Sequence, residues 1–293
     1  MKTAVIILNY NSEDETIKYV KKIEKYNCIN TIIVVDNFSE NGERLFSLKS
    51  DKVYVIRTEK NGGYSYGNNF GLKFLESLNE KYDYIVISNS DIEVKEEVFE
   101  ACFKELEQNS KTGICSPRMH DKNDKPIRRS SWKIRTPAID MANSTRLTEI
   151  LLYKLFKSGE YKEEEFSKNP RLKVEAVTGA FFAIRYDVFK KCGYFDENVF
   201  LFYEEDILAK KIQKLGYDTY SLNNVSFKHY ESSTIDKVFN YWKKIKTLQK
   251  SKMYFQKTYN NINIFQIFIF NVLNLWRKIE LLVEIPIRKI LKK

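Results

Sequence analysis

Cysteine is scarce in this sequence, and its spacing excludes two classes of protein. The 293 residues include four cysteines, which lie far apart and form no C-x-x-C pair: Cys28, Cys102, Cys115 and Cys192. A disulfide-stabilised domain or a structural zinc site needs cysteines that are paired or clustered. We therefore expect free thiols in a reducing compartment.

Long apolar runs are also missing, and with them the pattern of a membrane span or a secretory leader. The apolar run AVIILNY begins at Ala4, just after Met1, Lys2 and Thr3, but it is too short for a signal peptide and lacks a small-residue cleavage site. The longest strongly apolar stretch, 262–276, contains four amide side chains and is shorter than the ~20 residues that cross a bilayer. We expect the catalytic region to be cytoplasmic.

Two common nucleotide-binding signatures are absent as well. The segment NGGYSYGNN at 61–69 matches neither G-x-G-x-x-G nor G-x-x-x-x-G-K-[ST], which disfavours an NAD-dependent dehydrogenase. A nucleotidyltransferase normally holds its triphosphate with a basic, glycine-rich loop near the N-terminus, and residues 9–12 contain neither glycine nor a base. That class stays open as an alternative, as does a non-catalytic module that binds nucleotide sugars or glycans.

Acidic residues are rare in the last fifth of the chain, which carries the excess positive charge. The net charge is +10, and residues 237–293 hold thirteen Lys and Arg against only Glu280 and Glu284. Residues 1–236 are nearly neutral, with 36 bases and 37 acids. Because aliphatic and aromatic residues lie between the C-terminal bases, we expect an anionic membrane surface as the partner and no nucleic acid.

The same segment has the spacing of an amphipathic helix. Its polar side chains are three or four residues apart, or multiples of these: Asn263, Gln266, Asn274, Arg277, Glu284 and Arg288. We expect residues 236–293 to form a basic helical extension, with a kink near Pro286, that binds the inner face of the cell membrane. Packing on the catalytic domain or formation of an oligomer are the alternatives.

Short apolar runs alternate with helical patterns in the first part of the chain. The runs at 3–9, 31–35, 53–57 and 84–88 each end in polar residues, and helices are expected up to about residues 25 and 78. This alternation predicts an α/β fold with a mostly parallel sheet. Ligands bind at the carboxyl ends of strands in such sheets, so the four polar turns predict a site.

The middle of the chain is less regular. Residues 117–175 are rich in proline and charge, and we expect a variable, partly helical insertion on the acceptor side of the site. A strand is predicted over 174–185, passing through Thr178-Gly179-Ala180, and a helix over 204–215 that Gly216 closes. A further strand-like run, 225–227, precedes His229, and a mainly helical region follows.

Several polar groups could carry chemistry, although each alone is a weak signal. Asp91, in Asn89-Ser90-Asp91, could bind a hard divalent cation that neutralises a diphosphate leaving group. Asp36 could contact a pyrimidine base or a ribose, and the start of the helix after Asn61 could meet phosphate. A carboxylate of Glu204-Glu205-Asp206 could accept a proton from an acceptor hydroxyl. Taken singly, such residues more often form turns or complement a helix dipole.

Taken together, these segments resemble the family 2 glycosyltransferases, in particular the rhamnosyltransferase-like and capsule-type members. The resemblance covers about residues 1–235 and rests on IILNYN at 6–11, VVDN at 34–37, NGG at 61–63, NSD at 89–91, TGA at 178–180, EED at 204–206 and His229. It implies a GT-A fold, an inverting reaction, a UDP- or dTDP-sugar donor, a saccharide acceptor, and Mg²⁺ or Mn²⁺. A lipid-linked acceptor in surface polysaccharide synthesis would fit the basic tail.

The resemblance also assigns roles to single positions. The nucleotide-sugar side comprises Leu8, Asn9, Tyr10, Asp36, Asn61, Gly62, Asn68, Asn89 and Ser90, and the acceptor side comprises Gly179, Ala180 and Glu204. Asp91 corresponds to the metal-binding acid of the DXD-type motif, in which Asn89 replaces the first acid, and His229 to a second contact with metal or diphosphate. The catalytic base is Glu205 if counted back from Gly216, or Asp206 if the letters of a Glu-Asp pair are matched; we favour Glu205 and keep Asp206 as the alternative.

Overall fold

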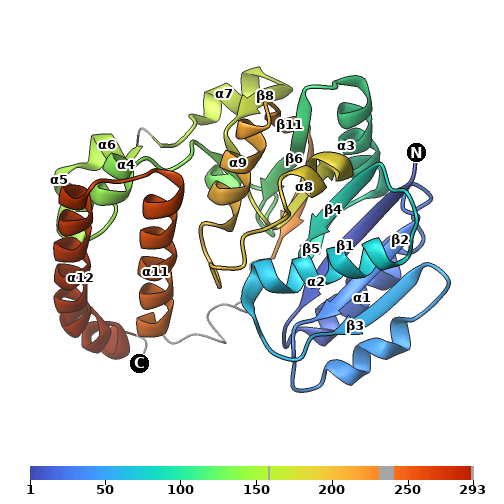
Figure 1. Cartoon of the computed structure of the whole chain (residues 1–293), viewed down its shortest axis with the longest axis horizontal. Coiled ribbons are helices and arrows are strands. Elements are labelled where there is room, and N and C mark those ends of the chain that lie inside the picture. The colour runs from blue at the N-terminus through green and yellow to red at the C-terminus, as the bar shows by residue number, and fades with distance from the viewer. Residues whose placement is uncertain (158, 231–240, 292–293) are drawn as a thin grey trace.

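The computed structural model describes residues 1–157, 159–230 and 241–291 of the chain (Figure 1). Within these residues the centre is a nine-stranded sheet. Its strands are β1 (Thr3–Asn9), β2 (Thr31–Asp36), β3 (Val53–Arg57), β4 (Tyr84–Ser88), β5 (Ile92–Glu93), β6 (Thr112–His120), β8 (Arg171–Val174), β10 (Phe181–Arg185) and β11 (Asp218–His229). The order is β3-β2-β1-β4-β10-β6-β11-β5, and β8 also pairs with β11.

Most neighbouring long strands of the sheet run parallel, as the alternation of runs and helices predicts. β3, β2, β1 and β4 are parallel neighbours, and β11 is parallel to β6. β10 enters between β4 and β6 in the antiparallel direction. The carboxyl ends of β1, β2 and β4 therefore meet at one edge, where the polar residues of the sequence analysis follow them.

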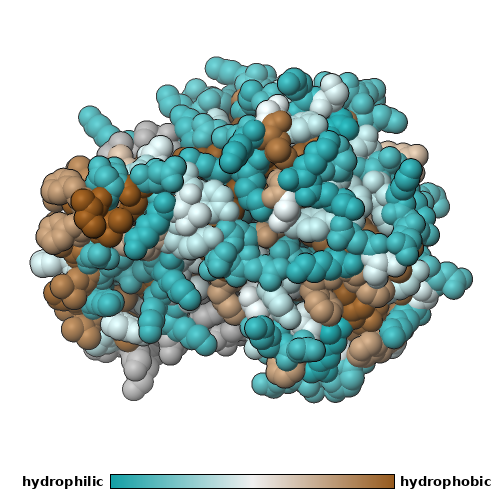
Figure 2. Space-filling view, viewed as in Figure 1, coloured by the Kyte–Doolittle hydropathy of each residue, from teal (hydrophilic) through white to brown (hydrophobic). Residues whose placement is uncertain are grey.

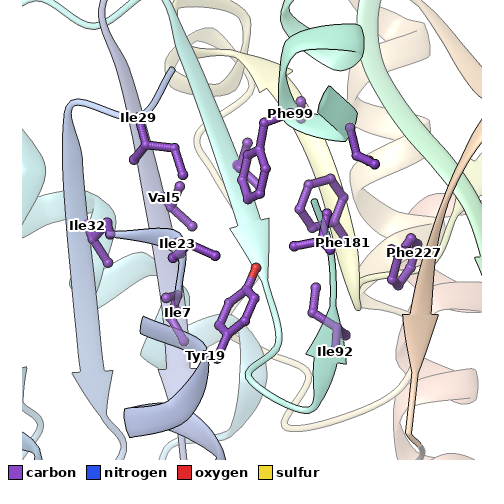
Figure 3. Close-up of a cluster of buried hydrophobic side chains, with 14 of the residues drawn as sticks. Val5, Ile7, Tyr19, Ile23, Ile29, Ile32, Ile92, Phe99, Phe181 and Phe227 are labelled. Atoms are coloured by element: carbon purple, nitrogen blue, oxygen red, sulfur yellow. The ribbon is translucent and has the colours of Figure 1, made fainter. Parts of the chain in front are cut away.

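Helices cover both faces of the sheet. α1 (Glu13–Ile23), the 3₁₀ helix η1 (Gly42–Leu48) and α3 (Glu96–Gln108) pack on one face, whereas α2 (Gly63–Ser77), α8 (Tyr186–Lys191) and α9 (Glu204–Lys214) pack on the other. Figure 3 shows Val5 and Ile7 of β1 beside Tyr19 and Ile23 of α1 in the first of these cores. Because β1 is buried on both faces, its sequence is a continuous apolar run instead of an alternating one.

The expected insertion is shorter than predicted, because both of its ends belong to the sheet. Residues 117–120 complete β6, and residues 171–174 form β8 against β11. The part between them contains η2 (Arg128–Ser130), β7 (Ser131–Trp132), α4 (Pro137–Ala142), α5 (Arg146–Leu151), α6 (Tyr153–Lys157) and α7 (Glu163–Lys168). The prolines and charges therefore marked an irregular, partly helical region, but not its boundaries.

The strand predicted over 174–185 is not continuous. β8 ends at Val174, β9 (Ala176–Val177) pairs with β7, and β10 begins at Phe181. Thr178, Gly179 and Ala180 lie in the break between β9 and β10. The helix closed by Gly216 is confirmed as α9, and this glycine has a φ of +80°. The short run before His229 is the end of the longer strand β11.

Two long helices, α11 (Tyr241–Tyr259) and α12 (Ile264–Leu291), follow and confirm the predicted helical extension. They lie side by side at one end of the molecule, next to α4, α5 and α6 (Figure 1). Pro286 lies inside α12. None of the helices in the described residues combines the length and the apolar character needed to cross a bilayer. The predicted boundary between 235 and 236 lies outside the described residues.

Candidate active site

The ends of β1 and β2 carry a network of hydrogen-bonded polar side chains. The Asn9 side chain donates hydrogen bonds to Ser39 Oγ (2.9 Å) and to Asp36 Oδ1 (3.3 Å). Asp36 is fully buried, and Arg57 Nε lies 3.3 Å from its Oδ2. A Cβ on Gly42 would lie 1.9 Å from that oxygen, so the glycine makes room for the carboxylate. Asp36 is therefore at the predicted strand end. Protein groups engage its Oδ1, whereas its buried Oδ2 has the ion pair with Arg57 but no hydrogen bond within the described residues.

The start of α2 is held against the segment that leads into α9. Gly63 has a φ of +89°, and a Cβ there would lie 2.0 Å from the carbonyl oxygen of Phe200. Tyr64 N donates to that same oxygen (3.0 Å). Asn61 Oδ1 accepts from Gly63 N (3.0 Å), with Gly62 between them as the N-cap. Glycine at position 63 therefore permits the close backbone contact with Phe200, and the hydrogen bond with Asn61 fixes where the helix begins.

Asn68 lies one turn further along α2. Its side chain is fully buried and donates to Tyr64 O (3.0 Å). Its Oδ1 has no hydrogen-bond partner within the described residues. Buried amide oxygens are rarely left unpaired, and their exceptions are commonly explained by a missing ligand or water.

Asp91 and His229 meet, although 138 positions separate them in the chain. His229 Nε2 lies 3.3 Å from Asp91 Oδ1. His229 ends β11, which pairs with β5 directly after Asp91. Tyr230 N also donates to Asp91 O (3.0 Å). His229 Nε2 is buried and makes no well-aligned hydrogen bond within the described part of the chain. The predicted pair is therefore assembled by strand pairing.

A series of backbone contacts connects this pair with the acids of α9. Asn89, which precedes Ser90 and Asp91, donates its N–H to Ala180 O (2.8 Å). The next residue back, Gly179, donates its N–H to Glu205 Oε1 (3.2 Å). Tyr64 Oη donates to Gly179 O (2.8 Å). The predicted acceptor-side turn therefore lies between the predicted metal residues and the predicted base.

The three acids that open α9 have different environments. Asp206 is fully buried and accepts hydrogen bonds from Arg135 N (3.0 Å), Arg135 Nη1 (2.8 Å) and Trp132 Nε1 (3.3 Å). Glu204 is also buried, and its Oε2 has no hydrogen-bond partner in the described residues. Glu205 is the one partly exposed acid of the three. Geometry thus separates two residues that the sequence left as competitors.

Burial raises the pKa of all three carboxyl groups. For Glu205, the loss of water outweighs the hydrogen bond from Gly179 N. For Glu204 the pKa is raised further, because the Glu205 charge adds to the effect of burial. For Asp206, burial exceeds the opposing attraction of Arg135. A carboxylate with a raised pKa is a stronger proton acceptor than an exposed one, as general base catalysis requires.

The backbone just before α9 is strained. Phe202 and Tyr203 have φ values of +72° and +71°, in the left-handed region that bulky side chains rarely adopt. Such residues cost about 1–3 kcal/mol each and tend to occur at functional sites. Tyr203 Oη donates to Asp140 Oδ1 (2.8 Å), and the Arg135 guanidinium lies over its ring, 4.6 Å from the centroid. These contacts hold the strained turn in place.

Four residues of this site escaped the sequence analysis as individual candidates: Tyr64, Trp132, Arg135 and Asp140. Tyr64 lies inside the NGGYSYGNN segment, so its position beside a glycine turn was the available signal. Trp132, Arg135 and Asp140 belong to the insertion, more than sixty residues before α9. No local pattern connects them with Asp206, because the contact exists only after the insertion folds back.

The remaining predicted donor residues lie around the first strand ends. Leu8 and Tyr10 flank Asn9 and are both partly exposed, and Ser90 is buried beside Asn89. A Cβ on Gly67 of α2 would lie 2.3 Å from Leu8 Cδ1, so the helix approaches β1 closely at this point. These positions adjoin the same edge of the sheet.

Comparison with known proteins agrees with this arrangement. The model of the family described as glycosyl transferase family 2 matches residues 4–193. The chain belongs to this family. A relative, the low-salt glycan biosynthesis hexosyltransferase Agl10 of Haloferax volcanii, is 28% identical over 203 residues, or 69% of this chain and 58% of that protein. The chain thus spans less than two thirds of that relative.

Solved glycosyltransferases share the fold. The S. aureus TarS 1–349 structure in complex with UDP-GlcNAc has a TM-score of 0.57 and 15% identity, covering 92% of this chain and 70% of the other. The mannosyltransferase PcManGT of Pyrobaculum calidifontis, in complex with GDP-Man and Mn²⁺, has a TM-score of 0.52 and 12% identity, with 92% and 79% covered. The family 2 chain described here therefore has the predicted GT-A fold.

Proposed function

We propose that this family 2 protein is an inverting glycosyltransferase that moves a sugar from a UDP- or dTDP-sugar to a hydroxyl of a saccharide acceptor. The observation that carries the proposal is the meeting of Asp91 and His229, 3.3 Å apart, at the strand edge that also presents Asn89. Contacts through Ala180 and Gly179 lead from there to Glu205. The site proposed for the leaving group and the proposed proton acceptor thus lie on either side of the turn 178–180.

A divalent cation fits the Asp91–His229 pair. The Asp91 carboxylate suits Mn²⁺ or Mg²⁺, as does the imidazole of His229, whose Nε2 has no well-aligned hydrogen bond within the described residues. Diphosphate oxygens and water would fill the other positions. No group of three or more His, Cys, Asp and Glu suited to a metal occurs among the described residues, in keeping with a site that the donor completes. When bound, the ion would neutralise charge on the departing diphosphate.

Glu205 is the residue we assign as the base. It is partly exposed, its carboxylate is fixed by Gly179 N, and burial raises its pKa. Asp206 instead uses its carboxylate to hold Arg135 and Trp132, which suits a positioning role. In the proposed reaction Glu205 accepts the proton of the attacking hydroxyl while the oxygen bonds to the anomeric carbon and the nucleoside diphosphate leaves from the opposite face.

We assign the other predicted residues to the donor side or the acceptor side of the site. On the donor side, Leu8, Asn9, Tyr10 and Asp36 shape the nucleoside end, with Asp36 acting through its buried network. Asn61, Gly62 and Asn68 position the start of α2, and Asn89 and Ser90 place Asp91. On the acceptor side, Gly179 and Ala180 form the turn beside the base, and buried Glu204 supports it.

We further propose a lipid-linked saccharide of surface polysaccharide synthesis as the acceptor, at the cytoplasmic face of the membrane. Two features support this proposal: the excess of bases in residues 237–293 and the apolar outer surface of α12. A lipid-linked acceptor is confined to the bilayer surface, so an enzyme bound there would meet it at a raised local concentration.

Release of nucleoside diphosphate from a panel of nucleotide sugars tests the proposal. We expect release from a UDP- or dTDP-sugar that EDTA abolishes and Mn²⁺ or Mg²⁺ restores. Glu205→Gln should lower turnover by about 10²–10⁴-fold with unchanged donor affinity, because it removes only the proton acceptor. Glu164→Gln, on the exposed side of α7, is the matched control and should behave like the wild type.

Two outcomes would contradict the assignment. Near-normal turnover of Glu205→Gln would show that another group is the base, and if Asp206→Asn alone then abolished turnover, that residue would be the candidate. Cation-dependent binding of a nucleotide sugar without any release, across the donor and acceptor panel, would indicate a binding module instead of an enzyme.

A further inference from the structure

The helix α12 buries Phe270 and Leu281 but exposes most of its large apolar side chains to water. Its outward surface carries nine large apolar side chains, with Ile264 81% and Leu282 68% exposed: Ile264, Phe265, Phe268, Val272, Leu275, Trp276, Ile279, Leu282 and Val283. Their spacing places them along one helical stripe. Figure 2 shows hydrophobic residues gathered at the end of the molecule that α12 forms. We call this stripe the outer face of α12.

The inward side of the same helix carries one arginine and two glutamates that pair with one another. The Arg277 side chain is 8% exposed and donates to Glu280 Oε2 (2.8 Å) and Glu284 Oε1 (2.6 Å). Tyr241 of α11 donates to Glu284 Oε2 (3.2 Å). Because a buried charge is costly unless it is paired, this network fixes which side of α12 faces the protein. The apolar stripe is therefore held outward.

A second segment of the chain extends the outer face. The backbone N–H groups of Arg146 and Leu147, at the start of α5, donate to the Glu280 carboxylate (2.9 and 3.2 Å). This contact fixes α5 beside α12. Ile150 and Leu151 of α5 are 74% and 70% exposed. Two segments more than a hundred residues apart thus expose apolar side chains at the same end of the molecule.

Charge indicates what covers this face. Among the exposed residues of α12 up to Pro286, Lys278 is the one charged side chain, since both acids of the segment point inward. Residues 237–293 carry thirteen bases and two acids. The exposed charged side chains of the neighbouring α11 are all lysines: Lys243, Lys246, Lys250 and Lys257. Such a surface attracts anionic lipid headgroups. Association through two copies of this face would bring two strongly basic segments together, which like-charge repulsion disfavours.

We infer that the outer face of α12, together with α5, docks on an anionic lipid bilayer, with α12 lying along the surface and not across it. A helix of 28 residues is about 42 Å long, and its apolar side would enter to the level of the headgroup and acyl boundary. The exposed Trp276 suits this depth, where indole rings concentrate. Docking of this kind is independent of the transfer reaction, because it needs no substrate.

The docked helices are also connected to the base helix by buried groups. Lys252 and Gln256 of α11 are buried, and Gln256 Nε2 donates to Asp140 Oδ2 (2.6 Å). Asp140 in turn accepts from Tyr203 Oη (2.8 Å), directly before Glu204. Ser251 Oγ donates to Leu201 O (2.8 Å). These contacts therefore fix the position of α11 and of the outer face of α12 relative to the start of α9.

Flotation of the full chain with lipid vesicles tests this inference. We expect binding to vesicles of phosphatidylcholine with added phosphatidylglycerol, weaker binding to phosphatidylcholine alone, and partial loss in high salt. The triple variant Phe268→Ser, Leu275→Ser, Leu282→Ser should lose about tenfold or more in affinity, because it removes apolar contact area. The matched control, Phe46→Ser with Leu215→Ser, changes exposed apolar residues elsewhere and should bind like the wild type.

Further measurements distinguish docking on lipid from self-association and from misfolding. Trp fluorescence of the wild type should be quenched by lipids brominated near the headgroup, and Trp276→Phe should lose much of this quenching. Unaltered vesicle binding of the triple variant would overturn the inference, as would absent binding of the wild type. A dimer that the triple variant dissociates would assign the face to a second copy. Circular dichroism and thermal unfolding of each variant confirm that it is folded.

Discussion

The sheet and the helix α12 place their apolar side chains differently. In β1 and β2 the apolar residues point into both cores, and polar residues follow at the strand ends. In α12 the ion pairs of Arg277 with Glu280 and Glu284 point inward beside the buried Phe270 and Leu281, whereas nine other large apolar side chains are exposed. The sheet is thus stabilised mainly by removing apolar area from water, whereas charged hydrogen bonds orient α12.

This difference shows that apolar side chains serve two purposes in one chain. In the sheet they fix strand register and so bring Asp91 to His229. In α12 the exposed apolar side chains contribute little to folding, because they stay in contact with water in the isolated chain. Mutations outside the active site should therefore affect the stability of the two regions unequally.

The largest effect is expected in the sheet. Phe181→Ala removes a fully buried ring of β10 and should lower the free energy of unfolding by about 3–5 kcal/mol, through lost burial and a cavity. The matched change Phe268→Ala, on the outer face of α12, should alter it by less than about 0.5 kcal/mol without lipid. Chemical denaturation of both variants measures the difference. Similar losses would show that α12 packs as a core helix.

A smaller effect is expected where charge orients the helix. Arg277→Ala leaves Glu280 and Glu284 without their shared partner and should cost about 2 kcal/mol locally, less than in a dry interior because both acids keep some contact with water. We expect faster proteolysis within α11 and α12, while the sheet stays folded. Lys278→Ala, an exposed neighbour, is the control. Loss of the whole fold at once would mean that both regions unfold as one unit.

The smallest expected contrast lies in the response to acid. Burial raises the pKa of Glu205 above 4.5, so activity should fall with decreasing pH before an ordinary carboxylate would protonate. The hydrogen bonds from Arg277 lower the pKa of Glu284 below 4.5, so its stabilising contribution is present above that pH and is lost only as pH falls through the lowered value. Turnover should thus decline while α12 is still in place.

Parallel pH profiles of turnover and of C-terminal proteolysis measure this contrast. Coincident transitions would show that the loss of activity follows unfolding and not protonation of the base. Glu164→Gln again provides a control for charge alone, since its side chain is exposed.

Much of the fold was predictable, because the signals that decide it are local. Apolar runs of four to seven residues with polar ends identified β1, β2, β3 and β4, and Gly216 marked the end of α9. The strand-end residues Asp36 and Asp91 were placed correctly for the same reason. The strand predicted through Gly179 was wrong as a continuous element, since a break there permits the contact with Glu205.

The choice between Glu205 and Asp206 illustrates what local signals leave undecided. The sequence favoured Glu205 but left Asp206 open, because adjacent carboxylates look alike without their surroundings. Arg135, 71 positions away, occupies Asp206 and leaves Glu205 partly exposed. Only a long-range contact could make that distinction.

The sequence alone determined the α/β class, the strand-end acids, the family and the two-sided character of α12, since each depends on residue types at short spacing. Tertiary structure decided that Asp91 meets His229, that Asp206 is occupied by Arg135, and that the charged side of α12 faces inward. Periodicity defines two faces of a helix but not which one is buried. That depends on which distant groups the fold places opposite to it.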